Sequence, residues 1–323
     1  MEKLKIGVLG CAEIARRKAI PAILQSDFFH LHCVASRSKT KAKDFSKLFG
    51  CKYVVGYDEL IDMTDLDVIY IPLPISLHMV WAIKALNANK HLLIEKSFAS
   101  SYEETKNIVE VARIKNLLVL ENFMFEHHKQ IEVIKQQINR IGALKALRSS
   151  FGFPPFKDKN NIRYDKTLSG GALYDAGAYT VKITGLIVGR DLNVLSSILL
   201  IDKDLQVDVS GGVFLSDTKG TVIQLAFGFE NYYQCNLELW GTKGKITTNR
   251  VFTAGEDLNT YINIETNEGQ EVITIEPDNH FVNILNFFGQ KLKKGKFEDE
   301  YIKILDQAQL MDTIQNKAEK IYK

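Results

Sequence analysis

The first 120 residues alternate short, apolar runs with longer amphipathic stretches, and this alternation limits the fold more than any other feature. Strand-like runs lie at residues 5–9, 31–35, 53–55, 68–71, 92–94 and 117–120, and helical spacing is found at 14–24, 39–49, 77–87 and 103–115. Strands buried on both faces alternate with crossover helices in parallel sheets. The pattern predicts an α/β domain, a Rossmann-type doubly wound parallel sheet, over residues 1–122.

After residue 122 the pattern changes to short alternating segments separated by turns. We expect a helix at 129–139, a strand at 144–148, a helix at 171–188, several strands between 191 and 275, and helices at 279–293 and 301–321. Turns at hairpin spacing indicate antiparallel pairing. Residues 123–323 are therefore predicted to form an α+β domain with a large, mostly antiparallel open sheet, whose C-terminal helix packs back on the first domain. The open face of such a sheet needs a cover, so we expect a homodimer or homotetramer.

The charge balance excludes some classes of partner. The chain of 323 residues has 41 Lys and Arg against 39 Asp and Glu, a net charge of +2, which argues against binding nucleic acid or an anionic membrane. No apolar run approaches the ~18 residues of a membrane span, and the N-terminus lacks a signal-peptide pattern. Neither the four cysteines nor the adjacent His127 and His128 have metal-site spacing. We expect a cytoplasmic protein without a metal.

The first apolar run leads into Gly10-Cys11-Ala12, part of a G-x-A-x-x-A motif. This is a variant of the dinucleotide fingerprint, in which a tight turn lets a pyrophosphate approach the N–H groups that open a helix. Ala12 puts a methyl group where the middle glycine usually lies. An ordinary strand-to-helix turn is the other interpretation, but the position after the first strand favours a dinucleotide.

The end of the second strand indicates which dinucleotide binds. Ser36, Arg37 and Ser38 stand where an NAD site usually has Asp or Glu. A guanidinium can pair with a 2′-phosphate, and the serines can donate hydrogen bonds to it. The sequence favours NADP(H), with NAD(H) possible; a solvated, basic helix start is the alternative interpretation.

Two later strand ends carry polar residues. Pro72, Leu73 and His78 follow the fourth strand, and Glu95 and Lys96 follow the fifth. Ligands of doubly wound sheets bind at the carboxyl ends of the strands. A lysine placed there can stabilise an alkoxide that forms on a carbonyl oxygen. On position alone, Lys96 could equally reach into solvent.

The segment that begins at Gly170-Gly171 opens a helix that bears Asp175 and Tyr179, four residues apart on one face. A carboxylate and a phenol so placed suit binding of sugar hydroxyls and delivery of a proton. Taken alone, the same pattern also describes an ordinary helix with a surface Asp and a half-buried Tyr.

These features resemble those of the Gfo/Idh/MocA oxidoreductases over essentially the whole chain. Stretches at 121–128, 151–155, 162–164 and 227–241 look like a narrower branch, the sugar 3-ketoreductases of deoxysugar nucleotide pathways. Two departures stand out: Ser97 follows Lys96 where the family usually has proline, and Tyr179 replaces the histidine of many members, as it does in the ketoreductases. The resemblance implies cofactor contacts at Gly10, Cys11, Ala12, Ser36, Arg37, Ser38, Pro72, Leu73, His78, Glu95, Lys96 and Asn122.

The resemblance also implies a reaction, hydride transfer between nicotinamide and a sugar hydroxyl or ketone. Tyr179 would supply the proton and Lys96 would stabilise the oxyanion. Asp175, with Arg163 and Tyr164, would hold the sugar or sugar nucleotide. We expect reduction of a nucleotide-linked keto-deoxysugar; a dehydrogenase of a free sugar, polyol or trans-dihydrodiol, and a non-catalytic NADP-binding sensor, are the alternatives.

Overall fold

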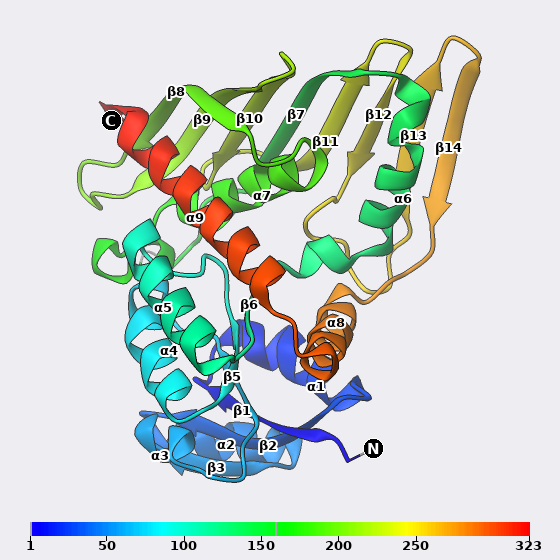
Figure 1. Cartoon of the computed structure of the whole chain (residues 1–323). Helices are drawn as coiled ribbons and strands as arrows, with labels where there is room; N and C mark the ends of the chain where they lie inside the picture. The colour runs from blue at the N-terminus through cyan, green and yellow to red at the C-terminus, as the bar shows by residue number, and fades with distance from the viewer. Residues whose placement is uncertain (1, 159) are drawn as a thin grey trace. The chain divides into compact units, whose positions relative to one another are not determined.

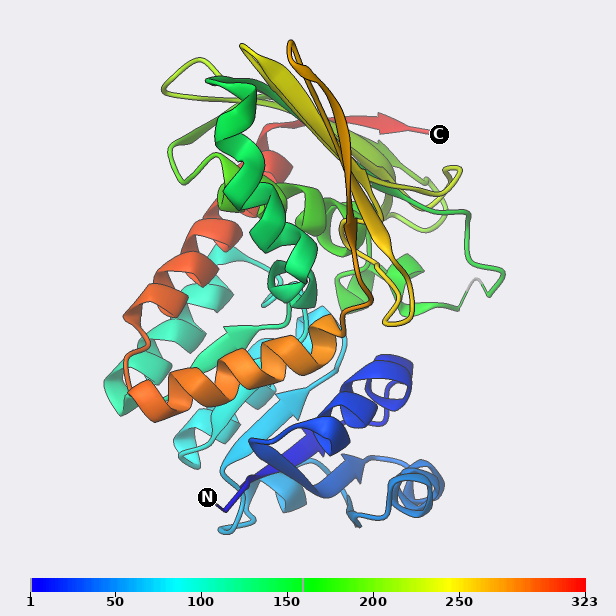
Figure 2. The ribbon, with the colours of Figure 1, turned by 90° about the vertical axis from the view of Figure 1, so that its right-hand side faces the viewer.

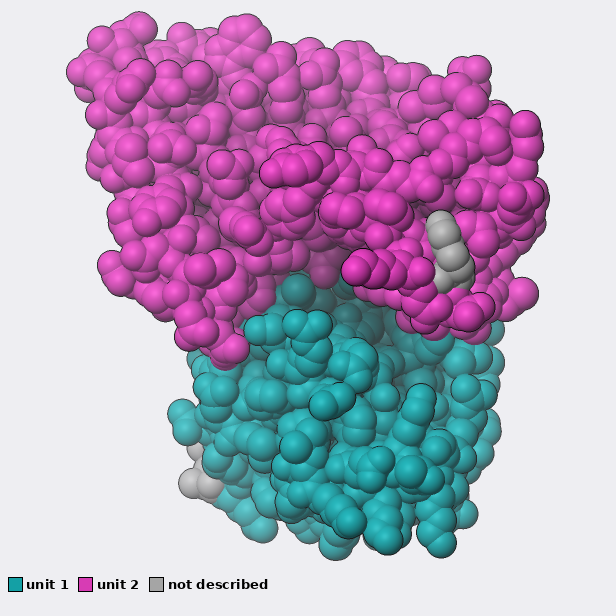
Figure 3. Space-filling model, turned by 180° about the vertical axis from the view of Figure 1, so that it is seen from behind, with its two compact units in different colours: residues 1–124, 281–308 teal, residues 125–280, 309–323 magenta. Residues whose placement is uncertain are grey.

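The structure is a computed structural model that describes residues 2–158 and 160–323, and the chain divides into two compact units. The first unit contains the residues up to 124 together with 281–308, and the second contains 125–280 and 309–323 (Figure 3). Both units are discontinuous in sequence. The domain limits expected from the sequence, 1–122 and 123–323, stay a prediction. Within the described ranges, no helix is long and apolar enough to cross a bilayer.

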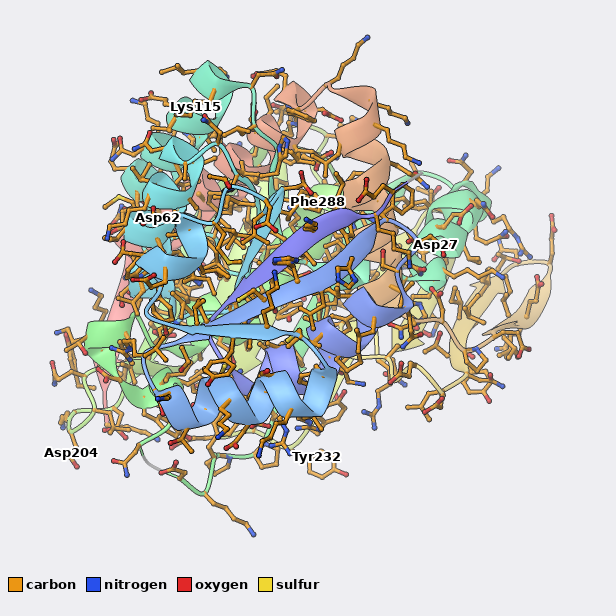
Figure 4. The ribbon with its side chains drawn as sticks, turned by 90° about the horizontal axis from the view of Figure 1, so that it is seen from below. Asp27, Asp62, Lys115, Asp204, Tyr232 and Phe288 are labelled. Atoms are coloured by element: carbon orange, nitrogen blue, oxygen red, sulfur yellow. The ribbon has the colours of Figure 1, made fainter. Side chains whose placement is uncertain are left out.

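The first unit is built on a six-stranded parallel sheet in the order β3-β2-β1-β4-β5-β6, coloured blue to green in Figure 1. Helices lie on both faces of this sheet (Figures 1 and 4). The strands are β1 (Leu4–Leu9), β2 (Phe29–Ser36), β3 (Lys52–Val55), β4 (Val68–Ile71), β5 (His91–Ile94) and β6 (Val119–Glu121). The helices are α1 (Ile20–Gln25), α2 (Lys39–Phe49), α3 (Asp58–Ile61), α4 (His78–Asn87), α5 (Tyr102–Lys115) and α8 (His280–Lys294).

The strand order reverses between β1 and β4, which are hydrogen-bonded neighbours. In sheets of this kind the loops that follow the two strands diverge at that point and leave a crevice for a ligand. The interior of the strands is apolar because helices cover both faces; Val8, Ile69 and Ile71 are fully buried. The fold class predicted for this part of the chain is confirmed.

Within the first unit, the segment 281–308 packs against the part formed by the residues up to 124. The ring of Phe288, labelled in Figure 4, stacks on that of Phe29 in β2 with 5.7 Å between the centroids. The hydroxyl of Tyr301 donates to the carbonyl oxygen of Leu117, 2.7 Å away. Tyr301 lies in α9 (Glu298–Lys317), which begins in the first unit and ends in the second.

The second unit contains a nine-stranded sheet in the order β14-β13-β12-β11-β7-β10-β9-β8-β15. Its pairs are antiparallel except β7 with β10 and β8 with β15, so the predicted mostly antiparallel sheet is confirmed. Helices α6 (Lys129–Gln137) and α7 (Ala178–Ile187) lie on one face of it (Figures 1 and 2). The strands are β7 (Leu144–Gly152), β8 (Leu192–Ile201), β9 (Asp208–Asp217), β10 (Val222–Gly228), β11 (Gln234–Gly241), β12 (Gly244–Asn249), β13 (Thr260–Thr266), β14 (Gly269–Ile275) and β15 (Ala318–Tyr322).

The end of the chain differs from the sequence-based expectation. The helix predicted to reach Ile321 ends at Lys317, and the next residues form strand β15. Ala318 to Tyr322 pair in parallel with Ser197 to Ile201 of β8, which supplies main-chain partners along the sheet edge. Pairing with this edge overrides the helical pattern of the sequence, as tertiary context commonly does.

Candidate active site

The turn after β1 is tight and leads directly into a helix. Gly10 has a φ of +128°, and a Cβ atom added to it would lie 2.8 Å from a methyl group of Leu73. Only glycine fits such a position without strain. The carbonyl oxygen of Ala12 accepts from Arg16 N over 3.0 Å, so the helix begins directly after the turn. The turn brings the predicted residues Gly10, Cys11 and Ala12 to a helix N-terminus, where N–H groups favour phosphate.

Cys11 is half-buried in this turn. Burial raises the pKa of its thiol to about 11, while the hydroxyl of Ser36 acts in the opposite direction. The thiol is therefore protonated and unreactive at neutral pH. Its place beside Ser36 means that the first and second strand ends contribute to one surface.

The end of β2 presents a positive charge beside two hydroxyls. Ser36 is buried and its Oγ accepts from Ser38 N over 3.1 Å, whereas Ser38 caps α2 through Lys41 N. Arg37 is exposed. Burial raises the pKa of Tyr57, while the charge of Arg37 and a hydrogen bond from it oppose that rise. Tyr57 thus holds the Arg37 side chain near the end of β2, where the 2′-phosphate of NADP(H) is predicted to bind.

His78 joins the loops that follow β4 and β5. Its Nε2 lies 2.8 Å from the carbonyl oxygen of Leu73, and its Nδ1 lies 3.1 Å from those of Ser97 and Phe98. Burial lowers the pKa of the imidazole, and the three carbonyl groups oppose this. The structure therefore gives His78 a main-chain clamping role at the predicted cofactor site, next to Pro72 and Leu73.

Glu95 forms the centre of a buried network beside Lys96. Its Oε1 accepts from the hydroxyl of Tyr70 over 2.6 Å and from Nδ2 of Asn122. Burial raises the pKa of Glu95, while these hydrogen bonds and the nearby charge of Lys96 oppose the rise. Asn122 is buried, and the network fixes its carboxamide. The structure thus brings together the predicted residues Glu95, Lys96 and Asn122 at the ends of β5 and β6; the peptide bond between Lys96 and Ser97 is cis.

In the second unit, the predicted residues Asp175 and Arg163 contact each other. Nε of Arg163 donates to Oδ2 of Asp175 over 2.6 Å, and the guanidinium lies 4.9 Å from the centroid of the Phe156 ring. Asp175 lies in η7 (Leu173–Gly177), a turn of π-helix that leads into α7. Such wide turns are frequent at functional sites. A carboxylate and a guanidinium held in one pair suit recognition of hydroxyl or phosphate groups.

Tyr179 lies in α7, the helix that follows Asp175, and its side chain is surrounded by aromatic rings from other segments. Its side chain is buried, and its ring centroid lies 5.2 to 5.7 Å from those of Phe125, Phe151 and Phe252. These contacts fix the plane of the phenol, and pairs of this kind add to the stability of a core. Tyr179 is therefore a rigidly held phenol rather than a mobile surface side chain.

Tyr164 has its hydroxyl and its ring engaged in contacts within the second unit. It is buried, its hydroxyl accepts from Phe156 N over 3.1 Å, and its ring packs on Phe156 and Phe229. The structure shows it bracing the segment that carries Arg163. Its predicted part in binding the substrate stays a prediction.

Comparisons with known proteins identify the family of this chain. Residues 4–123 match the model of an oxidoreductase family with an NAD-binding Rossmann fold, and residues 132–247 match the GFO/IDH/MocA C-terminal domain. A dTDP-3,4-didehydro-2,6-dideoxy-alpha-D-glucose 3-reductase from Actinomadura kijaniata is 35% identical over 322 residues, which cover 99% of this chain and 97% of that protein. The chain belongs to the Gfo/Idh/MocA oxidoreductase family. The resemblance inferred from the sequence is confirmed.

Other members of the Gfo/Idh/MocA family give the same result. A protein of the same name from Saccharopolyspora spinosa is 36% identical over 299 residues, which cover 92% of this chain and 90% of that protein. The crystal structure of a 3-ketoreductase from Actinomadura kijaniata in complex with NADP and TDP-benzene has a TM-score of 0.96 at 34% identity and covers 100% of both chains. As a Gfo/Idh/MocA protein, this chain is an oxidoreductase with the predicted pair of folds.

One residue beside the candidate site was not expected from the sequence. Asp208, the first residue of β9, accepts a hydrogen bond from Leu173 N at the start of the helix that carries Asp175 and Tyr179. Burial raises the pKa of Asp208 to about 6, although the N–H groups of Leu173 and Ala172 and the charge of Lys320 oppose this. The only signal in the sequence is an acidic residue between Val207 and Val209, both of which are buried.

Among residues 2–158 and 160–323, no group of three or more His, Cys, Asp or Glu side chains is arranged to hold a metal ion. The described cysteines form no disulfide.

Proposed function

We propose that this chain is an NADP(H)-dependent ketoreductase that reduces the ketone at carbon 3 of a dTDP-linked keto-deoxysugar. The observation that carries the proposal is the match with dTDP-3,4-didehydro-2,6-dideoxy-alpha-D-glucose 3-reductases, at 34 to 36% identity over 90% or more of this chain in three relatives. Full-length similarity at this level covers both the cofactor unit and the unit that bears Asp175 and Tyr179. The proposal therefore concerns the whole reaction and not the fold alone.

The end of β2 supports the choice of NADP(H). Arg37 is exposed and is held by Tyr57, and Ser36 and Ser38 lie on either side of it. A carboxylate at this position would repel a 2′-phosphate, whereas a guanidinium attracts it. The turn at Gly10, with a φ of +128°, lets a helix begin directly after β1, and the N–H groups at the start of that helix would contact the pyrophosphate. A bound nicotinamide would supply the hydride.

We assign the proton transfer to Tyr179 and the stabilisation of charge to Lys96. Reduction places a hydride on the carbonyl carbon and leaves negative charge on the oxygen, which then takes a proton. The phenol of Tyr179 donates that proton, and the ammonium of Lys96 lowers the energy of the charged oxygen until the proton arrives. The aromatic rings around Tyr179 hold its phenol in one orientation, and the network around Glu95 fixes the carboxylate that precedes Lys96 in the chain.

The pair formed by Arg163 and Asp175 binds the substrate in this proposal. Asp175 accepts a hydrogen bond from a sugar hydroxyl, and Arg163 contacts the sugar nucleotide, whose diphosphate is anionic. The two side chains already lie in contact, so little conformational freedom is lost when the substrate binds.

We also propose that the chain works in the cytoplasm as a homodimer. Large apolar side chains are exposed on the face of the nine-stranded sheet opposite α6 and α7, on β8, β9, β10, β11 and β13: Ile198, Phe214, Val222, Trp240 and Tyr261. Exposed apolar surface of this kind is usually covered by another subunit.

The experiment is a turnover assay with purified protein, NADPH and dTDP-3,4-didehydro-2,6-dideoxyglucose, followed through the loss of NADPH absorbance. We expect turnover with NADPH, weaker turnover with NADH, and none when a free keto-sugar replaces the nucleotide-linked one. Oxidation of free sugars or polyols with NADP⁺, in the absence of this reduction, would instead identify a catabolic dehydrogenase. Tight NADPH binding without turnover of any carbonyl substrate would identify a sensor.

A further inference from the structure

Asp208 meets the start of the η7–α7 helix although it is 35 residues away in sequence from the group it binds. Its Oδ2 accepts from Leu173 N over 2.6 Å. Its Oδ1 takes the place of a side chain on Gly171, because a Cβ atom added there would lie 2.2 Å from it. Gly171 has a φ of +129°, which residues other than glycine adopt only with strain. The turn at Gly171 and the carboxylate of Asp208 therefore fit each other.

The helix depends on this carboxylate because its own sequence provides no cap. Ala172, at the N-cap position, makes no side-chain hydrogen bond to the first turn. The first N–H groups of a helix need partners from outside it, and a negative charge at this end is stabilised by the helix dipole. Asp208 supplies both from the adjacent sheet, and η7 packs against β9.

The same turn connects the residues assigned to the substrate. The carbonyl oxygen of Arg163 accepts from Gly171 N over 2.9 Å, so the turn also fixes the main chain of Arg163. Asp175 follows two residues after Leu173 and binds Arg163 through its side chain. A change at the start of the helix therefore acts on Arg163, Asp175 and, farther along, Tyr179.

We propose that Asp208 is a positioning residue for the reduction, whose carboxylate fixes the start of the helix so that Asp175 and Tyr179 keep their working orientation. The proposal rests on the proposed function and adds a residue that does not contact the reacting atoms. Because Asp208 acts on the second unit, its loss affects the sugar nucleotide and the proton transfer. The affinity for NADPH, which depends on the turn at Gly10 and on Arg37, stays unchanged.

The test compares Asp208→Ala and the conservative Asp208→Asn with a matched control on the same strand. Asp217 ends β9 and accepts from Lys219 N and Thr221 N, each over 2.8 Å, in a turn at the far end of the strand. Asp217→Ala therefore removes a carboxylate with the same kind of main-chain bonds. For each protein we would measure kcat and KM for the sugar nucleotide, the Kd of NADPH by fluorescence, and Tm.

We expect Asp208→Ala to lower kcat/KM about 10- to 100-fold, as small misplacements of reacting groups do, with an unchanged Kd of NADPH. Asp208→Asn keeps one oxygen that can accept from Leu173 N, so this variant should recover most of kcat. If the alanine variant does not fold, the proposal is tested with Asp208→Asn, for which we expect a raised KM for the sugar nucleotide. Asp217→Ala should lower Tm without changing kcat or KM.

Wild-type kcat and KM in the Asp208 variants would overturn the positioning role. An equal loss of activity in Asp217→Ala would overturn it too, because the loss would then come from lower stability in general. A wild-type enzyme that binds NADPH but has no turnover would overturn the proposed function and this proposal with it. The two failures are therefore distinguishable.

Discussion

Arg163 and Asp175 form a direct pair, with Nε of the guanidinium 2.6 Å from Oδ2 of the carboxylate, and both belong to the segment braced by the turn at Gly171. The pair orients two polar groups that would otherwise turn independently. Charge-assisted bonds of this kind are stronger and more directional than neutral ones. The two side chains are therefore coupled, and a change in either should affect the other.

The first prediction concerns that unit. Arg163→Lys keeps the positive charge but loses the planar fork that binds Asp175, so KM for the sugar nucleotide should rise about 10-fold or more, with a smaller change in kcat. Steady-state kinetics at saturating NADPH measure this. Arg140→Lys is the matched control, because Arg140 binds Glu271 over 2.7 Å on the surface of the same unit. An unchanged KM in Arg163→Lys would remove Arg163 from the substrate site.

The second prediction concerns the choice of cofactor. Arg37→Asp replaces a charge that attracts the 2′-phosphate with one that repels it, so the Kd of NADPH should rise roughly 10- to 100-fold while that of NADH stays the same or falls. Lys43→Asp makes the same change of charge at an exposed position of α2 and should leave both constants unchanged. Equal effects of the two substitutions would show that only the overall charge matters.

The third prediction concerns the proton donor. Tyr179→Phe keeps the ring contacts with Phe125, Phe151 and Phe252 but removes the hydroxyl, so kcat should fall about 10²- to 10⁴-fold while Tm and the Kd of NADPH change little. Phe151→Leu serves as a comparison. This substitution leaves the hydroxyl of Tyr179 in place but removes one of the rings that pack against it, so it should lower Tm. A wild-type kcat in Tyr179→Phe would move the proton transfer to Lys96.

The alternation of strands and helices was sufficient to predict the parallel sheet, because the strands inside the edge strand β3 are buried on both faces and each crossover is helical. The positions of Gly10, Arg37 and Lys96 at strand ends follow from that sheet without further information, since ligands of doubly wound sheets bind at those ends. The contacts that hold these residues could not be predicted. Tyr70, which donates to Glu95, reads in the sequence as one more apolar residue of a buried strand.

The second unit was predicted less completely because its contacts are distant in sequence. Asp208 caps a helix 35 residues before it, and no local pattern connects the two. Strand β15 was expected to be helix, because its pairing with β8 spans more than 100 residues and leaves no mark on the local sequence. Arg163 and Asp175 were predicted to bind the substrate, which stays a prediction, and their direct bond was found only in the structure.

The fourth prediction concerns pH and stability. The pKa of Asp208 is raised by burial to about 6, from an ordinary value of 3.8, so the folded protein holds this proton at pH values where the unfolded chain has released it. The stabilisation that comes from this bound proton is therefore fully present below about pH 4 and is lost as the pH rises through about 6, whereas the carboxyl group accepts the hydrogen bond from Leu173 N in either state. Asp208→Asn removes this titration, so the Tm of the wild type relative to the variant should be higher at acidic pH than at neutral pH.

Asp217 provides a control of opposite sign for this measurement. Burial alone would raise the pKa of Asp217, but hydrogen bonds from Thr221 and Lys219 lower it overall. Its contribution to stability is therefore present at neutral pH and is lost as the pH falls. The difference in Tm between the wild type and Asp217→Asn should shrink in acid. The same slope for both variants would mean that Asp208 does not titrate in the predicted window.

The fifth prediction concerns assembly through the outer face of the nine-stranded sheet. Phe214 and Trp240 are 36% and 52% exposed on β9 and β11. A second subunit would remove these rings from water. With the double substitution Phe214→Glu and Trp240→Glu, dimer formation would bury unpaired charge, so the protein should be monomeric. Light scattering after size-exclusion chromatography measures the mass. Leu48→Glu, at an exposed position of α2 in the first unit, should leave the dimer intact; a wild type that is monomeric at all concentrations would refute assembly through this face.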